Sequence, residues 1–494
     1  MSKDQSSYRQ IMKATSLFGG VQVFNIIVNI VRTKFVAILL GPVGIGISGL
    51  LTSTISLISS LTNFGLGTSA VRNISSAFAS GDETRVAQLV VVVKRLVWIT
   101  GALGALIMLI FSSFLSELTF GNHQYTYAFA WISISLLINQ ISIGQNVVLR
   151  GMRKLKYLAQ ASMFGSILGL FTTVPLFYYY ELDGIVPGII VTSISTLLLT
   201  WYYSNKVKVL KSQVSRKRTL LEGKDMLKMG FMISLSGLIA QGGSYVVRIF
   251  ISNTGGVDQV GLYTAGFAII NSYVGMIFAA MSTDYYPRLS SVSNDNDESR
   301  LIITQQAEIA LLILAPVILI FLVFINWVVI LLYSSKFIEV SDMILWAILG
   351  IFFKAVSWSI AFIFLAKGAS KLFFWNELIT NIYILGFNII GYYFWGLTGL
   401  GVSFLVGYML YVFQVYFITN RMYNFHFTRG FYKIFISQLT LASCCLGVVK
   451  YFDSPYSFLF GGIFIGLSSY LSFKELDNRL GLKAILKNLK DKFL

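Results

Sequence analysis

Long apolar runs separated by short polar loops recur along the whole chain. Most runs reach or exceed the roughly 20 residues that an α-helix needs to cross a bilayer. The pattern therefore predicts an all-α integral membrane protein with about 14 transmembrane helices. The expected helices cover approximately residues 13–40, 43–73, 86–113, 125–149, 156–180, 185–205, 226–252, 259–288, 301–332, 342–367, 371–394, 397–420, 432–450 and 456–473.

Composition agrees with a chain whose mass lies mostly in the bilayer. Of the 494 residues, 56% are hydrophobic and 12% are charged, whereas a soluble globular protein carries about 25% charged residues. The formal net charge is +17. In a soluble protein that charge would point to nucleic acid, but here almost all the basic residues lie in one set of loops, so no nucleic-acid partner is expected.

The distribution of Lys and Arg among the loops sets the predicted orientation. Roughly 28 of them fall in one set of loops, whereas the other set holds only Lys336 and Lys450, and cytoplasmic loops carry the excess of positive charge. Both termini are therefore expected in the cytoplasm, which requires an even number of spans.

Two stretches in the two halves of the chain resemble each other. Val31-Arg32-Thr33-Lys34 leads into a glycine-rich turn at Gly41 to Gly49, and Val246-Val247-Arg248 leads into a second at Val257 to Gly266. Three further pairs keep nearly the same offset of about 216 residues: Val71-Arg72 with Pro287-Arg288, Asp82 to Arg85 with Asp297 to Arg300, and Leu149 to Leu155 with Ala366 to Leu372. Six expected helices separate the copies, so both point the same way across the membrane. We therefore expect two six-helix lobes related by a pseudo-two-fold axis along the membrane normal.

The repeat and the loop charges divide the chain into five parts. An N-lobe of six helices covers 1–205, a basic cytoplasmic linker covers 206–225, and a C-lobe of six helices covers 226–421. Two appended helices follow at 422–473, and residues 474–494 form a cytoplasmic tail expected to lie as an amphipathic helix on the inner leaflet. The linker is expected to be a solvated tether that is attracted to anionic membrane lipids.

Four cations lie furthest from the predicted cytoplasmic loops: Arg32, Lys34, Arg248 and Lys354. An arginine at the bilayer centre costs several kcal/mol on an isolated helix, with estimates from about 3 to above 10. One alternative is that these side chains reach an interface along the helix, above all that of Lys34. The other is a partly dehydrated cavity, in which guanidinium groups suit a phosphate or pyrophosphate that they can grip in bidentate fashion.

Four more cations end helices on the predicted cytoplasmic side: Arg72, Arg150, Arg288 and Lys367. They either anchor the helix ends or form a cationic entrance that collects an anionic headgroup. Among the acids, Asp284 precedes Arg288 by four residues, a spacing that permits a helical ion pair. Glu308 and Glu377 are expected to pair with cavity cations or to couple transport to an ion gradient.

Signals of an enzyme or of a metal site do not stand out. The sequence shows no nucleophile elbow, no phosphate-cradling glycine loop and no His/Cys/carboxylate set with metal-ligand spacing. Cys444 and Cys445 are adjacent inside an apolar run, which favours packing over a disulfide or a metal. We therefore expect a protein that is not an enzyme, with no cofactor and no metal.

Several of these motifs resemble one known group of transporters. They are Lys34 through Gly41-Pro42-x-Gly-x-Gly, Arg248 with Val260 to Tyr263, Asp284 to Leu289, Ser335-Lys336-Phe337, Lys354, Leu365 to Gly368, Phe373 and Glu377. Over roughly residues 10–420 the chain resembles the multidrug/oligosaccharidyl-lipid/polysaccharide exporter superfamily. Within it, the chain is most similar to the polysaccharide transport family, which includes the O-antigen flippases.

The resemblance implies a function and a place in the cell. Two lobes would form a cavity that alternates between the leaflets of a bacterial cytoplasmic (inner) membrane. The implied substrate is an undecaprenyl-pyrophosphate-linked oligosaccharide, moved from the inner to the outer leaflet. The polymerase and chain-length proteins of a glycan export pathway are candidate partners.

Three alternatives stay open. Fourteen spans are also typical of the lipid II flippases of peptidoglycan synthesis, so this is the runner-up. A cation-coupled multidrug antiporter of the same fold would need acids in the first lobe, and the expected helices 13–40 and 43–73 contain no Asp or Glu. A membrane glycan ligase would need a sizeable outward loop, and none predicted here exceeds about a dozen residues.

Overall fold

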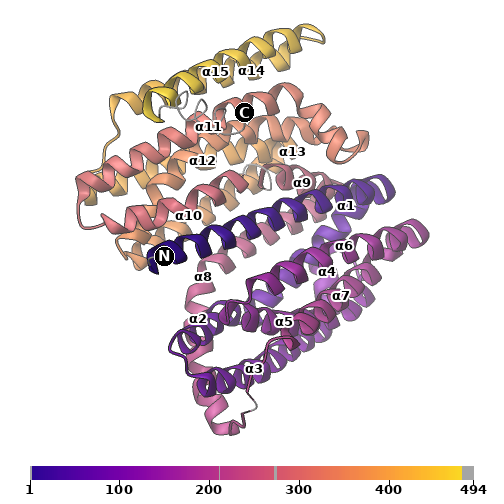
Figure 1. Cartoon of the computed structure of the whole chain (residues 1–494). Coiled ribbons are helices and arrows are strands. Elements are labelled where there is room, and N and C mark those ends of the chain that lie inside the picture. The colour runs from indigo at the N-terminus through magenta and orange to yellow at the C-terminus, as the bar shows by residue number, and fades with distance from the viewer. Residues whose placement is uncertain (1–2, 211, 272–274, 481–494) are drawn as a thin grey trace, which may run out of the picture. The chain divides into compact units, whose positions relative to one another are not determined.

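The computed structural model describes residues 3–210, 212–271 and 275–480, and within these ranges every regular element is a helix (Figure 1). The all-α fold class is therefore confirmed. The α-helices are α1 (Lys3–Thr62), α2 (Leu66–Ala79), α3 (Glu83–Ile110), α4 (Ser112–Phe120), α5 (Thr126–Gly151), α6 (Leu155–Tyr180), α7 (Ile185–Asn205), α8 (Arg216–Gly255), α9 (Val257–Ile269), α10 (Gly275–Ser291), α11 (Asn296–Leu332), α12 (Val340–Ala366), α13 (Ser370–Tyr423), α14 (Arg429–Tyr451) and α15 (Tyr456–Leu480). Short 3₁₀ helices occur at η1 (Glu181–Gly184) and η3 (Ser335–Phe337).

Long apolar helices make this a multi-pass membrane protein. In the described ranges, nine helices are long and apolar enough to cross a bilayer, or up to ten if the bent helix α8 is one span. Three of the nine stretches, with 43, 51 and 54 residues, are about twice the length of one crossing. Each bends where the backbone turns to positive φ, at Gly41, Glu181 and Gly396, so each is long enough for two crossings.

One expected helix is interrupted. The run 43–73 is broken because α1 ends at Thr62 and α2 begins at Leu66, after Gly65 at φ 63°. At that point the backbone of α8 crosses so closely that a Cβ on Gly65 would collide with the Gly230 carbonyl. The expected run 259–288 comprises α9 and α10, and residues 272–274 between them lie outside the described ranges.

The chain divides into two compact units, each described here by itself. The first comprises Met1–Gly261 with Leu332–Ser334, and the second comprises Leu262–Leu331 and Ser335–Leu494. Helix α8 belongs to the first unit because its residues contact α1, α2, α3 and α4. Tyr245 fixes this packing, since its hydroxyl lies 3.1 Å from Thr54 Oγ1 on α1 and 2.7 Å from Thr119 Oγ1 on α4. The division into six-helix lobes at 206–225 stays a prediction.

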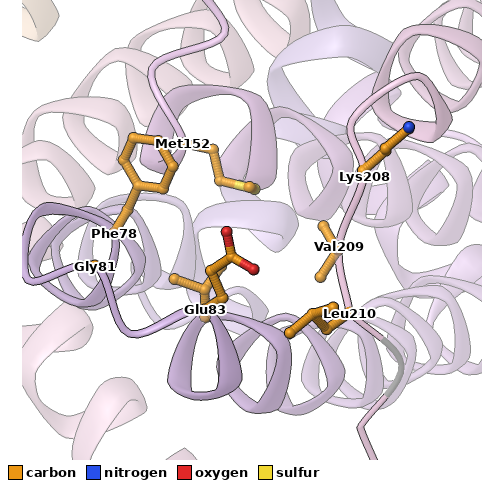
Figure 2. A pocket seen from close by; sticks show the side chains of 8 residues that line it. Phe78, Gly81, Glu83, Met152, Lys208, Val209 and Leu210 are labelled. Carbon is orange, nitrogen blue, oxygen red and sulfur yellow. The ribbon is translucent and has the colours of Figure 1, made fainter.

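The linker after α7 packs against the first unit instead of being a solvated tether. Val207 and Val214 are buried at 7% and 6% exposure in the core formed by α2, α3 and α5. The alternation Lys206-Val207-Lys208-Val209 explains this, because an extended segment turns successive side chains to opposite faces. Figure 2 shows Val209 and Leu210 beside a pocket of about 410 Å³ into which Glu83 points, with the Lys208 ammonium turned away. From Arg216 onward the expected linker is already helix α8.

The backbone repeats in the register that the sequence predicts. Three pairs of positive-φ residues are each 215 residues apart: Gly41 and Gly256, Arg153 and Gly368, and Glu181 and Gly396. The turns after α5 and α12 also share their hydrogen bonds, with Lys154 N donating to Leu149 O and Ala369 N to Phe364 O, both at 2.8 Å. These are matching Schellman-type ends, so the internal repeat extends from sequence to local geometry.

The two glycine-rich turns contact each other reciprocally within the first unit. A Cβ on Gly46 would lie 2.9 Å from the carbonyl carbon of Val257, and a Cβ on Gly261 would lie 2.7 Å from that of Pro42. A shift of 215 residues exchanges Pro42 with Val257 and Gly46 with Gly261. A two-fold axis produces this kind of self-complementary contact. Glycine is required on both sides, because only a residue without a side chain lets two backbones approach this closely.

Polar side chains connect the appended helices to each other and to the rest of the second unit. Gln438 on α14 accepts a hydrogen bond from Ser468 (2.7 Å) and donates one to Ser472 (3.1 Å) on α15. Arg479 on α15 forms an ion pair of 3.0 Å with Glu308 on α11. The predicted tail 474–494 is therefore helical to Leu480 as the end of α15, and its remaining residues lie outside the described ranges.

Candidate functional site

A polar chamber of about 440 Å³ lies inside the first unit, between α1, α5, α6 and α7. Amides and hydroxyls make up most of its wall, together with two arginines. The polar lining residues are Gln22, Asn25, Asn29, Arg32, Asn146, Arg150, Ser162, Ser166, Thr192, Thr196 and Thr200. A wall of this kind within membrane-spanning helices is costly unless it faces water or a polar ligand.

Helical periodicity brings these residues onto one surface. On α1 the polar residues 22, 25, 29 and 32 follow steps of three and four, and on α7 residues 192, 196 and 200 follow steps of four. Residues at these spacings share one face of an α-helix. Helices α1 and α7 thus present polar stripes to the chamber in an otherwise apolar sequence.

Hydrogen bonds inside the chamber position its amides and hydroxyls. Asn25 Nδ2 donates to Ser162 Oγ, and Ser166 Oγ donates to Asn25 Oδ1, both at 2.8 Å. The hydroxyls of Thr192, Thr196 and Thr200 donate to backbone carbonyls of their own helix at 2.7–2.8 Å. A hydroxyl whose hydrogen is used in this way keeps its lone pairs as acceptors. The chamber therefore offers amide donors and hydroxyl acceptors, which are the groups that bind sugar hydroxyls.

Arg32 and Arg150 make the chamber electropositive. Among the described lining residues these two are cationic and none is acidic. Arg32 is half-buried, and its Nη1 lies 3.9 Å from the position that a Cβ on Gly169 would take. The small residue leaves room for the guanidinium beside α6. A phosphate or carboxylate is the natural ligand of a guanidinium group in such a pocket.

The other three predicted pyrophosphate ligands are not among the residues that line this chamber. Lys34 is half-buried on α1 but does not line this chamber. Arg248, on α8, donates to the Ser244 hydroxyl one turn earlier, at 2.6 Å. Lys354 belongs to the second unit, with its ammonium 5.6 Å from the Phe404 ring centroid and 5.3 Å from that of Tyr408. Cation–π contacts of this kind stabilise a positive charge away from water.

The four cations predicted at the cytoplasmic entrance have different surroundings. Arg150 lines the chamber with Arg32, whereas Arg72 is exposed on α2 and donates to Met229 Sδ at 3.1 Å. Arg288 lies 3.9 Å from Asp284, so the predicted ion pair is present at a long distance. Lys367 donates to the carbonyl of Ser293 and to the Asn296 side chain, and burial lowers its pKa. Lys367 thus ties the turn between α10 and α11 to the end of α12.

The two remaining acids have distinct roles. Glu308 is buried and paired with Arg479 of the appended helix α15, not with a cavity cation. Glu377 on α13 is half-buried and accepts a hydrogen bond of 2.5 Å from Tyr411. Polar groups surround it, as Asn376 donates to Tyr411 at 3.1 Å and Gln414 donates to Asn376 at 2.8 Å. Glu377 therefore lies in a hydrogen-bonded cluster of neutral side chains.

The amides and hydroxyls of the chamber are not predicted by the pattern of charges along the chain, because residues such as Gln22, Asn25 and Asn29 carry none. Their steps of three and four in the first apolar run were the available signal. Polar residues in phase on one membrane helix predict a face turned away from lipid.

Comparisons with known proteins place the chain in a family. A family model described as polysaccharide biosynthesis protein matches residues 35–342, more than half of the chain. A protein described as a putative O-antigen transporter, from Shigella flexneri, is 25% identical over 403 residues, which cover 78% of this chain and 92% of that protein.

Solved structures of the same fold include transporters of two kinds. The lipid II flippase MurJ in its inward closed conformation matches with a TM-score of 0.68 and 14% identity, covering 95% of this chain and 99% of that chain. An inward-facing multidrug resistance transporter of the MATE family matches with a TM-score of 0.67 and 17% identity, covering 81% of this chain and 94% of that chain. These likenesses show the fold, and the family match over residues 35–342 shows that the chain belongs to the polysaccharide biosynthesis protein family.

Proposed function

We propose that this protein is a flippase for a lipid-linked oligosaccharide. Its substrate would be an undecaprenyl-pyrophosphate-linked repeat unit, such as that of an O-antigen, moved from the inner to the outer leaflet of a bacterial cytoplasmic membrane. The observation that carries the proposal is the chamber of α1, α5, α6 and α7, which combines two arginines with a wall of amides and hydroxyls. The family match supports a glycan pathway.

The two kinds of group in the chamber match two parts of such a substrate. Arg32 and Arg150 suit the diphosphate or an acidic sugar, since each guanidinium can bind two oxygens at once. Asn25, Asn29 and the three threonines suit sugar hydroxyls. The polyprenyl chain needs no protein site, because it stays in the lipid. Lys34, Arg248 and Lys354 remain candidate cations for other stages of transport.

Rocking of two lobes would expose the substrate alternately to the two leaflets. In this scheme both termini are cytoplasmic, and the polymerase and chain-length proteins of the export pathway are candidate partners. Glu377 is the candidate for coupling to an ion gradient, because its neighbours Tyr411 and Asn376 are neutral. Glu308 is excluded from that role in the proposal, because Arg479 neutralises it.

A lipid II flippase is the second candidate function, supported by the structural likeness to MurJ. Lipid II also combines a pyrophosphate with sugars, so the chamber chemistry alone fits both substrates. A multidrug antiporter is less well supported, because organic cations need acidic ligands and the described lining of the chamber has none. A glycan ligase would require a catalytic set, and the sequence offers no candidate.

Proteoliposomes that contain a fluorescent undecaprenyl-pyrophosphate trisaccharide test the proposal directly. We expect the wild-type protein to move this lipid, and Arg32→Ala or Arg150→Ala to slow it about tenfold or more, the effect of losing a charged hydrogen bond. Lys156→Ala is the matched control, because Lys156 is exposed on α6 and does not line the chamber.

Wild-type rates in the Arg32→Ala/Arg150→Ala double variant would remove the chamber from the mechanism. A comparison of the Arg32→Ala/Arg248→Ala double variant with Arg32→Ala alone tests the expectation that Arg248 binds the diphosphate. A parallel assay with lipid II distinguishes the two candidate functions. Transport of lipid II at a higher rate than any undecaprenyl-linked oligosaccharide would favour the second.

A further inference from the structure

A second cationic site lies on the first unit, away from the chamber. It is a groove of about 630 Å³ between the middle of α3 and the start of α8. Three cations line it: Lys94, Arg95 and Arg216. The principal apolar side chains beside them are Trp98, Ile99 and Leu220. No acid is among the described residues that line it. The proposed transport function uses none of these side chains.

The groove has a charged part and an apolar part, as an amphiphile requires. On α3, Lys94 and Arg95 are followed one turn later by Trp98 and Ile99, so all four share one side of the helix. Trp98 is 56% exposed and Ile99 is 58% exposed, and Leu220 across the groove is 67% exposed. Large exposed apolar side chains beside charges mark a membrane-interface site.

The position along α3 puts the groove at headgroup level. The helical stretch from Leu96 through α3 and α4 to Phe120 is long enough to cross a bilayer. The candidate span Glu83–Ile110 has 28 residues, and Lys94 and Arg95 lie about three turns from its first residue, on the half that leads to the basic loops. Long cationic side chains extend along a helix toward the headgroups from such a depth. Tryptophan is enriched at the same depth, which agrees with Trp98.

Arg95 is held in place by the linker. Its Nη1 donates to the Val214 carbonyl at 2.7 Å and to the Thr219 hydroxyl at 2.8 Å. Glu222 does not neutralise the groove, because it accepts hydrogen bonds from Arg85 (2.6 Å) and Arg218 (2.9 Å). The charge in the groove is thus fixed in position and uncompensated by that acid.

We propose that this groove binds an anionic phospholipid of the cytoplasmic leaflet. Lys94, Arg95 and Arg216 hold the headgroup phosphate, and Trp98, Ile99 and Leu220 contact the first part of an acyl chain. A soluble phosphate would leave the apolar part unused, which is why the site fits a lipid. Because Arg95 also holds the linker at Val214, a bound lipid stabilises the path of the chain between α7 and α8.

Quenching of Trp98 by brominated lipids tests the site in the purified full-length protein. Brominated phosphatidylglycerol and brominated phosphatidylcholine are compared in mixed micelles. The fluorescence of Trp98 is obtained as the difference between the emission of the wild type and that of Trp98→Phe. We expect phosphatidylglycerol to quench at lower concentration. The Lys94→Gln/Arg216→Gln variant should lose that preference by about fivefold per charge, whereas Lys217→Gln, exposed next to Arg216 but outside the groove, should keep it.

Three results would overturn the proposal. One is equal quenching by the two lipids in the wild type. Another is a loss in Lys217→Gln as large as in the paired variant, which would mean a diffuse charge effect. The third is competition by glycerol phosphate at the concentration at which the lipid binds, which would indicate a free phosphate site. A Lys94→Arg/Arg216→Lys variant changes the same two side chains but keeps both charges, so it should retain the preference. A loss in this variant too would mean that changes at these positions disturb the fold. The readout is lipid binding, so it does not depend on the flippase assay.

Discussion

The reciprocal contact of the glycine turns makes a strong prediction about two single methyl groups. In Gly46→Ala, the new Cβ would lie 2.9 Å from both the carbonyl carbon and Cγ1 of Val257. In Gly261→Ala, it would lie 2.7 Å from the Pro42 carbonyl carbon and 3.0 Å from the Gly46 nitrogen. Both new methyl groups meet backbone atoms, which cannot rotate away as a side chain can.

The size of the required movement follows from these distances. The nearest atom to each new Cβ is the carbonyl oxygen of Val257 or of Pro42, at 1.9 Å. Carbon and oxygen atoms normally approach no closer than about 3.3 Å, so the two turns must separate by roughly 1.4 Å at each substitution. Overpacking of this kind costs about 1–3 kcal/mol, and a fixed backbone places the cost near the upper end. Within a helix, alanine is about 0.5–1 kcal/mol more favourable than glycine. Each variant is therefore expected to lose a net 1–2 kcal/mol, roughly, of its free energy of unfolding.

Thermal unfolding of the purified variants in detergent measures this effect, with Gly243→Ala on α8 as the matched control because nothing lies within 4 Å of its Cβ position. Since the two contacts share one crossing, the Gly46→Ala/Gly261→Ala double variant should lose less stability than the two singles added together. Unchanged stability in both singles, or strict additivity in the double, would refute the reciprocal contact.

Three further predictions concern single side chains. Arg479→Ala should destabilise the protein by about 1–3 kcal/mol, because it leaves the buried carboxylate of Glu308 without its 3.0 Å partner; Arg479→Ala/Glu308→Gln should recover part of this loss in the same unfolding assay. Tyr245→Phe should cost about 1 kcal/mol by removing hydrogen bonds to Thr54 and Thr119, and an unchanged midpoint would contradict the role of Tyr245 between α8, α1 and α4. Glu377→Gln should leave binding of the lipid-linked glycan intact and remove the dependence of its transport on an imposed ion gradient, whereas a gradient response equal to that of the wild type would exclude Glu377 from coupling.

Sequence patterns could predict much of the helical framework. Hydrophobic run length locates membrane helices because a bilayer admits hardly any other backbone structure, and the bounds of α5, α6, α7 and α12 lie within two residues of those expected. The register of the repeat could also be predicted from the sequence, because the backbone geometry restricts the residue type at certain positions. Positive-φ positions such as Gly41 and Gly256 require particular residues, so they remain visible in the sequence.

Interruptions of helices were harder to predict. Asn63 to Gly65 lie within one apolar run, and α1 ends there because the backbone of α8 crosses at Gly230. The linker shows the same limit: its lysines suggested a solvated tether, while the burial of Val207 and Val214 depends on the core of α2, α3 and α5.

The sequence by itself determined an all-helical membrane protein with a repeat, an expected orientation and a set of costly intramembrane cations, because these properties depend on local composition and spacing. The surroundings of these cations depend on how the helices pack. Packing puts Arg32 and Arg150 on the wall of one pocket with the amides of α1, pairs Glu308 with Arg479, and places Lys354 on aromatic rings. A side chain's partners belong to other helices, and periodicity along one helix specifies its faces but not which helix packs against each of them.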